Sequence, residues 1–125
     1  MPTILVVDDE EVVRSVVRDM LEPAGYTILD TGDPQHALRV AREQPVHLLL
    51  TDVVMPLMRG PELATKLLAL SPSTKVLLMS AYPMSEVALS GRAFLGKPFS
   101  VQGLNDRVRQ MLAQASPFAR PSRPS

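Results

Sequence analysis

Short apolar runs alternate with amphipathic stretches along almost the whole chain. The apolar runs predict buried strands, and they occupy residues 3–7, 26–29, 47–51, 75–79 and, more weakly, 93–95. Between these runs, apolar residues recur at the spacing of a helix. Because parallel strands are joined by right-handed helical crossovers, the alternation predicts an α/β fold of three layers. We expect a doubly wound, five-stranded parallel sheet with helices on both faces.

The same pattern predicts where the helices begin and which faces they bury. The second helix is expected to begin at Asp33 and Pro34, an N-cap acid and a proline at the first helical position, and the last to begin after Ser100. The pattern weakens between residues 79 and 94, which leaves room only for a short or irregular fourth helix near residues 85–90. The residues expected to face the sheet are Val12, Val13, Val16, Val17, Met20 and Leu21 on the first helix, Leu63, Leu67 and Leu70 on the third, and Leu104, Val108, Met111 and Leu112 on the last.

Composition limits the function more than the fold. The chain has 125 residues, and we expect one folded domain over residues 1–115 and a tail rich in Pro, Ser and Arg over residues 116–125. Its 13 basic and 13 acidic residues give no net charge, which argues against direct nucleic-acid binding. The absence of cysteine excludes a disulfide framework, a thiolate zinc site and a cysteine nucleophile. No apolar run is long enough to span a membrane, so we expect a cytoplasmic protein.

Three acidic residues follow two of the predicted strands. Asp8 and Asp9 come after the first apolar run and Asp52 after the third, so we expect their carboxylates at the carboxyl edge of the sheet, where open α/β sheets bind ligands. Like charges packed together are costly unless a cation or a proton relieves them, which indicates a divalent metal, a raised pKa, or both. The alternative is that Asp8 and Asp9 only cap the first helix and that Asp52 is a turn residue.

A magnesium ion (or Mn²⁺) suits this group of acids. Mg²⁺ prefers oxygen ligands in near-octahedral geometry, keeps several waters and often needs only one or two carboxylates. Asp9 and Asp52 are expected to coordinate the ion directly, Asp8 through a water, and Val54 through its backbone carbonyl. With the metal drawing off charge, an ionised Asp52 can attack a phosphoryl group and form an aspartyl phosphate.

Two further polar side chains follow predicted strands. Ser80 comes directly after the fourth apolar run and Lys97 shortly after the fifth. An ammonium group pairs with carboxylates at rest and with a phosphoryl oxygen after transfer, and a hydroxyl can donate a hydrogen bond to the same group. Taken singly, Ser80 would be a turn serine and Lys97 a solvated lysine, but with the acids they complete a phosphoryl-binding site. Arg14 and Arg18, one helical turn apart, are expected to form a solvated face.

Taken in order, these motifs resemble the receiver domain of two-component response regulators. The resemblance covers about residues 3–115 and implies a flavodoxin-like fold with strand order 2-1-3-4-5 and a site between the first and third strands. The set is specific although each piece alone is weak. The segments that carry it are Val6-Val7-Asp8-Asp9-Glu10, Asp52 with Met55-Pro56 and Gly60, Ser80-Ala81, and Lys97-Pro98-Phe99.

The resemblance implies a function and a role for each site residue. Asp52 would receive the phosphoryl group from a phosphohistidine of a sensor histidine kinase or a His-phosphotransfer domain, so the chain would be a phosphoacceptor and not a turnover enzyme. Asp8 and Asp9 would be the magnesium acids. Ser80 and Lys97 would bind the phosphoryl group.

The resemblance also implies a switch. Phe94 matches the aromatic switch position, and the bond between Lys97 and Pro98 looks like the family's cis peptide. Phosphorylation would draw the Ser80 hydroxyl inward and free space that Phe94 fills by turning from an exposed to a buried rotamer. The segment between Ser80 and Lys97, which builds the fourth helix and part of the family's dimerisation face, is several residues shorter than usual. We therefore expect a monomer or a weak dimer.

Two other functions fit parts of the sequence. A pseudo-receiver would keep the fold as a phosphorylation-independent protein-interaction module, but the complete set of acids, hydroxyl and lysine argues against it. An aspartyl-nucleophile phosphatase would place its nucleophile and acid two residues apart after the first strand, at Asp8 and Glu10, yet no cap or substrate-binding insertion is present. A phosphoryl-accepting signalling module is therefore the main interpretation.

Overall fold

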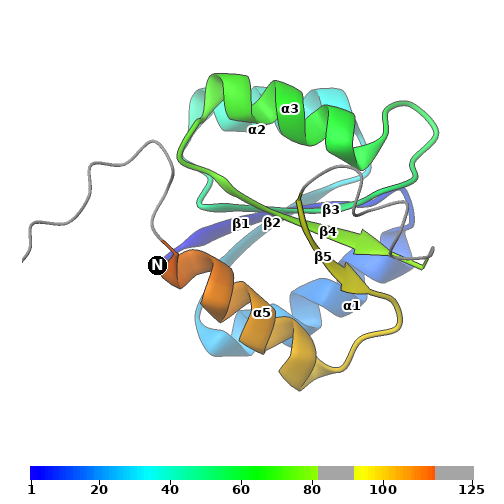
Figure 1. Cartoon of the computed structure of the whole chain (residues 1–125), viewed down its shortest axis with the longest axis vertical. Coiled ribbons are helices and arrows are strands. Elements are labelled where there is room, and N and C mark those ends of the chain that lie inside the picture. Colours follow the sequence, from blue (N-terminus) through cyan, green and yellow to red (C-terminus); the bar gives the residue numbers. More distant parts are fainter. Residues whose placement is uncertain (82–91, 115–125) are drawn as a thin grey trace, which may run out of the picture.

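The strands assemble into one parallel sheet. In the computed structural model, which describes residues 1–81 and 92–114, the strand order is β2-β1-β3-β4-β5 (Figure 1). This order confirms the predicted doubly wound fold, and the winding direction reverses between β1 and β3. The five strands are β1 (Thr3–Val7), β2 (Thr27–Thr31), β3 (Leu48–Asp52), β4 (Lys75–Ser80) and β5 (Ala93–Gly96).

Helices cover both faces of the sheet. Figure 1 shows α2 and α3 on one face and α1 and α5 on the other. The predicted helix starts are confirmed, because the Asp33 side chain accepts a hydrogen bond from the Gln35 amide and the Ser100 side chain one from the Gly103 amide, each at 2.9 Å. The helices are α1 (Glu11–Leu21), α2 (Pro34–Glu43), α3 (Gly60–Leu70) and α5 (Val101–Ala113), with a 3₁₀ turn at Glu22–Ala24.

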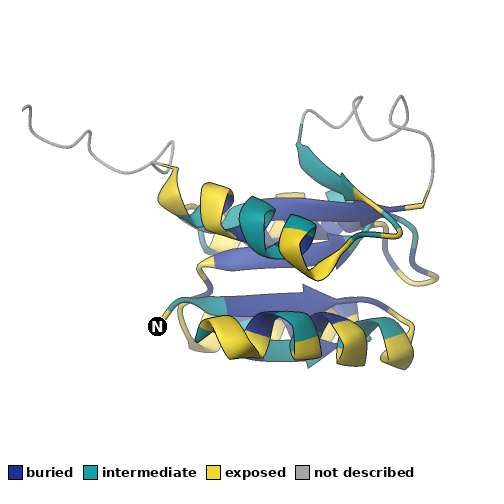
Figure 2. Cartoon of the chain, turned by 90° about the horizontal axis from the view of Figure 1, so that it is seen from below, coloured by how far each residue is buried: buried dark blue, intermediate teal, exposed yellow. Residues whose placement is uncertain are grey.

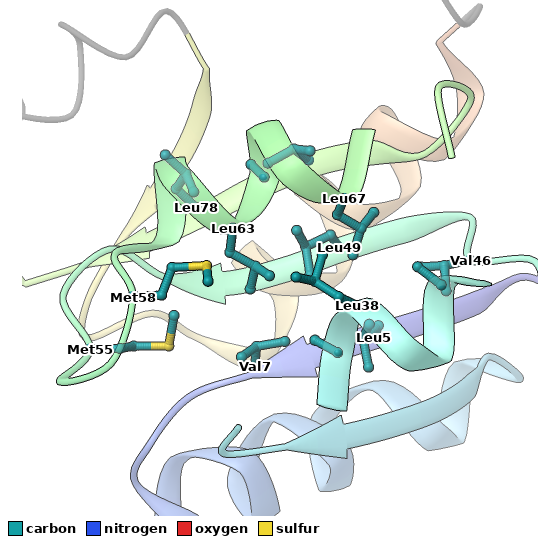
Figure 3. Packing of buried hydrophobic residues seen from close by; sticks show 14 of the residues in the cluster. Leu5, Val7, Leu38, Val46, Leu49, Met55, Met58, Leu63, Leu67 and Leu78 are labelled. Atoms are coloured by element: carbon teal, nitrogen blue, oxygen red, sulfur yellow. The ribbon is translucent and has the colours of Figure 1, made fainter. Parts of the chain in front are cut away.

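Alternate residues of each strand pack against opposite helical layers, as the two-residue period of a strand requires. Leu5, Val7 and Leu49 belong to the core beneath α2 and α3 (Figure 3), whereas Ile4 and Val6 belong to the core beneath α1 and α5. Figure 2 shows the central strands buried while the helices keep exposed outer faces. Because β1 and β3 are buried on both sides, the side chains that leave their carboxyl ends have a rigid support.

Three residues expected to face the sheet are exposed instead. Val12 is 74% exposed, Val16 43% and Leu70 42%. The six apolar positions predicted for α1 spread over about half of the helix circumference, which is wider than the roughly 100° stripe that one packed face covers. Val17 and Leu21, at one side of this arc, are buried, whereas Val12 and Val16, at the opposite side, are exposed.

The second strand begins and ends later than predicted. It pairs with β1 through Asp30 and Thr31, two polar residues that the apolar pattern excluded from the strand. The predicted fourth helix near residues 85–90 and the predicted tail over residues 116–125 lie outside the described residues. Within the part of the chain that is described, none of the helices combines the length and the apolar character that a membrane span needs.

Candidate functional site

The three predicted acids meet at the carboxyl edge of the sheet. Asp52 is the last residue of β3, and Asp8 and Asp9 follow the end of β1, the neighbouring strand. One carboxylate oxygen of each acid lies within 4.8 Å of those of the other two. Asp8 is buried, Asp52 is half-buried and Asp9 is exposed. The acids therefore line a site that is closed at its base and open to solvent at Asp9.

Hydrogen bonds fix both the side chain and the backbone of Asp8. Its Oδ1 accepts a hydrogen bond from the Glu10 amide at 2.9 Å, and its Oδ2 accepts one from Lys97 Nζ at 3.1 Å. The Asp8 amide donates to the Thr31 carbonyl at 3.2 Å, and its own carbonyl accepts from Arg14 Nη1 at 2.8 Å. These contacts satisfy a fully buried carboxylate and fix the loop between β1 and α1.

Lys97 connects the acids of both strands. Its Nζ lies 3.1 Å from Asp8 Oδ2 and 3.6 Å from Asp52 Oδ1. The peptide bond between Lys97 and Pro98 is cis, and the Lys97 amide donates to the Ser80 carbonyl at 2.8 Å. One ammonium among three carboxylates leaves an excess of negative charge, which is the electrostatic condition that favours a bound divalent cation.

The pKa of Asp52 lies above its usual value. Burial raises the pKa of this carboxyl most strongly, the positive charge of Lys97 lowers it, and the negative charge of Asp8 raises it again. Because the two raising effects outweigh Lys97, the metal-free pocket penalises the ionised form of Asp52. A cation bound among the acids would remove that penalty.

The remaining predicted residues lie beside this cluster. Val54 is half-buried and lines a pocket of about 340 Å³ together with Asp9, Asp52 and Lys97. Ser80 ends β4 and is buried. Phe94, on β5, is half-buried and packs against the core beneath α2 and α3.

Ser80 and Phe94 share one face of the sheet. Phe94 pairs in register with Leu78, and Ser80 comes two residues after Leu78, so it points to the same face. A Cβ placed on Gly96, the partner of Ser80, would lie 4.0 Å from the Phe94 ring. Ser80 and the Phe94 ring therefore lie on the same face of neighbouring strands.

Gly60, the first residue of α3, allows this helix to approach the end of β3. The Gly60 amide donates to the Val53 carbonyl at 2.8 Å, and a Cβ at this position would lie 2.2 Å from the Asp52 carbonyl oxygen. No side chain fits so close to a backbone atom, so the glycine at position 60 allows the contact that anchors the loop after Asp52.

An apolar groove runs from the acid pocket along α1. The groove has a volume of about 350 Å³ and shares Val13, Ala81 and Lys97 with the acid pocket. Val12 and Val16 form one wall, and the groove is completed by Val17, Met20, Pro98 and Phe99. It thus joins an exposed apolar surface to the charged site.

The sequence did not predict the role of every site residue. Glu10 and Ala81 belong to the segments that carry the resemblance but were assigned no role in the main interpretation, and Val13 was expected only to face the sheet; all three line the acid pocket. The expectation of a solvated face at Arg14 and Arg18 is wrong for Arg14, whose side chain is 17% exposed and reaches the Asp8 carbonyl. Its place one turn into a helix that begins beside the acids puts it near the site, but that place does not distinguish a bound side chain from a solvated one.

The strand order and the acid cluster at the point where the winding reverses define the class of the protein. It is a doubly wound α/β domain with its site at the carboxyl ends of the central strands. The family model described as response regulator receiver domain matches residues 4–109. The chain therefore belongs to the response regulator receiver family.

Relatives of known sequence agree with this assignment. The chain is 31% identical over 121 residues to the response regulator receiver protein CpdR of Brucella abortus, covering 92% of this chain and 100% of CpdR. It is 34% identical over 115 residues to the probable transcriptional regulatory protein TcrX of Mycobacterium tuberculosis, covering 88% of this chain and 49% of TcrX. The chain thus spans the whole of one relative and about half of the other.

Solved structures agree as well. The receiver domain of the hybrid histidine kinase CckA matches with a TM-score of 0.77 and 37% identity, over 88% of this chain and 98% of that domain. The response regulator TrrA of Thermotoga maritima, solved in complex with Mg²⁺-BeF, matches with a TM-score of 0.80 and 28% identity, over 89% of this chain and 99% of TrrA.

Proposed function

We propose that the chain accepts a phosphoryl group on Asp52 from the phosphohistidine of a sensor histidine kinase or a His-phosphotransfer domain. The observation that carries this proposal is the convergence of Asp8, Asp9 and Asp52 within 4.8 Å, with Lys97 bridging two of them. The chain would act as a phosphoacceptor with self-dephosphorylation and would not turn over a separate substrate.

The acids fit a magnesium ion. Asp8, Asp9, Asp52 and the backbone carbonyl of Val54 are the oxygen donors that would hold it, directly or through water. When bound, Mg²⁺ would offset the charge of the acids and of the incoming phosphoryl oxygens. Support for this assignment comes from the excess negative charge of the cluster and from the Mg²⁺-BeF complex of the related TrrA.

Asp52, Lys97 and Asp8 would each have a separate role in the transfer. An Asp52 carboxylate oxygen attacks phosphorus and forms the O–P bond, while the P–N bond to the donor imidazole breaks and its electron pair stays on that nitrogen, which takes a proton from solvent. Lys97 Nζ, 3.6 Å from Asp52 Oδ1, then pairs with a phosphoryl oxygen. Asp8 keeps Lys97 in place through its own ion pair.

Phosphorylation would then be transmitted through β4 and β5. The Ser80 hydroxyl would move toward the phosphoryl group, and Phe94, on the same face of the neighbouring strand, would occupy the space that is freed. Couplings of this kind are typically worth about 1 to 3 kcal/mol, so the phosphoryl group would shift an existing equilibrium between two surface states.

The phosphodonor would dock on the apolar groove of α1. A phosphohistidine has to enter the acid pocket, and the groove is continuous with that pocket through Val13, Ala81 and Lys97. Exposed Val12 and Val16 would give the histidine-bearing domain an apolar surface to cover while its imidazole reaches Asp52.

The two alternative functions have less support. A pseudo-receiver has no need for a lysine that bridges two acids, one of which has a raised pKa. A phosphatase with Asp8 as its nucleophile would need that carboxylate to be accessible, but Asp8 is fully buried and bound to the Glu10 amide and to Lys97.

Phosphoryl transfer from a small-molecule donor tests the proposal. Incubated with acetyl phosphate and Mg²⁺, the wild-type chain should gain the mass of one phosphoryl group, as followed by intact-mass spectrometry. The Asp52→Asn variant should gain none, and chelation of the metal should abolish the gain in the wild type. Uptake that persists in Asp52→Asn would place the phosphoryl group elsewhere and overturn the proposal.

A further inference from the structure

We infer that Arg14 is a positioning residue for the metal-binding acids, because its guanidinium fixes the peptide group that joins Asp8 to Asp9. The inference rests on the proposed function, since it assigns to Arg14 a role toward the same Mg²⁺ site. Arg14 itself would touch neither the ion nor the phosphoryl group; it acts through the backbone of the acids.

The contacts of Arg14 join three elements. Arg14 lies on α1; its Nε donates to Asp30 Oδ2 on β2 at 2.9 Å, and its Nη1 donates to the Asp8 carbonyl at 2.8 Å. The side chain is 17% exposed, so these two hydrogen bonds are largely shielded from water. A single guanidinium therefore ties the acid loop to the helix on one side and to the edge strand on the other.

The bond to the Asp8 carbonyl sets the direction of Asp9. A peptide group is planar, so the Asp8 carbonyl and the Asp9 amide lie in one plane and fixing the oxygen orients both. The other side of Asp8 is fixed by its amide, which donates to the Thr31 carbonyl at 3.2 Å. Within the described residues, no hydrogen bond or ion pair holds the exposed Asp9 carboxylate itself, so its position depends on this backbone.

Asp30 makes a cation next to a metal site tolerable. An uncompensated guanidinium beside the acids would repel Mg²⁺, but Asp30 accepts from Arg14 and also from Arg18. Burial alone would raise the pKa of Asp30, yet the hydrogen bonds from the two arginines outweigh burial and hold that pKa below its usual value. Asp30 thus stays ionised and offsets the charge of Arg14.

Gly32 leaves room for this arrangement. A Cβ at position 32 would lie 2.9 Å from Arg14 Nη1 and 3.4 Å from the Asp8 carbonyl oxygen. The nearer atom is the far end of a flexible side chain, so a methyl group here would displace the guanidinium more readily than it would disturb the fold. Gly32→Ala therefore breaks the proposed contact and keeps both charged residues.

The Mg²⁺ affinity of the full chain, measured by titration with MgCl₂ and amide chemical shifts, tests the inference. Arg14→Met should weaken Mg²⁺ binding by about tenfold or more, the usual effect of losing a residue that orients a metal ligand. The matched control is Arg18→Met, which also loses an ion pair with Asp30 but donates to the Ile28 carbonyl and not to Asp8. Its affinity should stay within about twofold of wild type.

Gly32→Ala provides the second arm, and it decides the matter if Arg14→Met does not fold. We expect it to weaken Mg²⁺ binding while urea unfolding stays close to wild type. Wild-type affinity in Gly32→Ala, or equal affinities in Arg14→Met and Arg18→Met, would overturn the positioning role and leave phosphorylation of Asp52 standing. A wild-type chain that binds no Mg²⁺ would overturn the metal site of the proposed function together with this inference.

Discussion

The burial of Asp52 in the pocket lowers the stability of the folded chain when its carboxyl is ionised. Burial and the charge of Asp8 raise the pKa of the Asp52 carboxyl more than Lys97 lowers it. The folded chain therefore binds more protons than the unfolded chain at pH values between the usual aspartate pKa and the raised one, and folding stability falls as pH rises through that window. Such a penalty is typical of groups that a site keeps for chemistry.

The first prediction follows from this penalty. Without Mg²⁺ and at about pH 7, the free energy of unfolding of Asp52→Asn should exceed that of wild type by roughly 0.5 to 2 kcal/mol, because the variant has no charge to desolvate. The difference should shrink as the pH falls toward and below the usual aspartate pKa of about 4, because the wild-type carboxyl then becomes protonated in both states. Urea unfolding at the two pH values measures both effects, and an equal or lower stability of Asp52→Asn near neutral pH would contradict the argument.

Single residues differ in how far the sequence predicts them. The places of Asp8, Asp9, Asp52 and Lys97 could be predicted, because each follows an apolar run and parallel strands bring their carboxyl ends to one edge. The role of Arg14 could not, because a basic residue on an amphipathic helix has the same pattern whether it is solvated or bound to a backbone carbonyl. Only the close approach of α1 to the acid loop distinguishes the two.

Two elements shape the site, and the first is the start of α3. This helix begins against the end of β3 because Gly60 has no side chain to meet the Asp52 carbonyl. The contact holds the start of the loop after Asp52 against the sheet through the Val53 carbonyl. Close packing against backbone atoms leaves no flexible partner that could yield to an added atom.

The second prediction tests this contact. Gly60→Ala should lower the free energy of unfolding by about 1 to 3 kcal/mol, since its Cβ would sit 2.2 Å from the Asp52 oxygen. Gly96→Ala is the control, because its nearest neighbour is the Phe94 ring at 4.0 Å and its effect should stay within about 0.5 kcal/mol. Urea unfolding compares the two, and equal stabilities would show that α3 shifts freely away from β3.

The second element is the outer flank of α1. Helical spacing predicted an apolar face here, but not its division into a buried stripe and an exposed one. That division depends on how closely α5 and the loop after β5 approach, which the spacing within one helix does not encode. Val12 and Val16 therefore became a wall of the groove instead of part of the core.

The third prediction concerns that wall. Val16→Asp should slow phosphotransfer from an autophosphorylated histidine kinase that phosphorylates the wild type, and leave phosphorylation by acetyl phosphate unchanged. Leu70→Asp is the matched control, since Leu70 is about equally exposed, at 42% against 43%, and lies on α3 across the sheet. Radiolabel transfer measures the rates; equal slowing by both substitutions, or slowing with acetyl phosphate as well, would exclude a docking role for the groove.

At the scale of the whole molecule, the fold could be predicted from the sequence because strands and helices alternate regularly along the chain. Each strand is a short apolar run between helices, so the local pattern already requires crossovers and a parallel sheet, and the buried strands of Figure 2 are the predicted ones. The strand order came from the resemblance to receiver domains and is confirmed. The limits of β2 were missed because Asp30 is polar, yet it lies in the strand and binds two arginines from α1.

The metal site, Lys97 and the docking groove all serve the formation of one bond, between Asp52 and phosphorus, in the proposed function. Borohydride reduces an aspartyl phosphate to homoserine, and trypsin releases residues 43–59, a peptide in which Asp52 is the only aspartate. After treatment with acetyl phosphate and Mg²⁺, peptide mass spectrometry should find homoserine at position 52, and none when the metal is chelated. Homoserine in the peptide of residues 1–14, which carries Asp8 and Asp9, or in no peptide at all, would contradict the assignment of Asp52 as the phosphoacceptor.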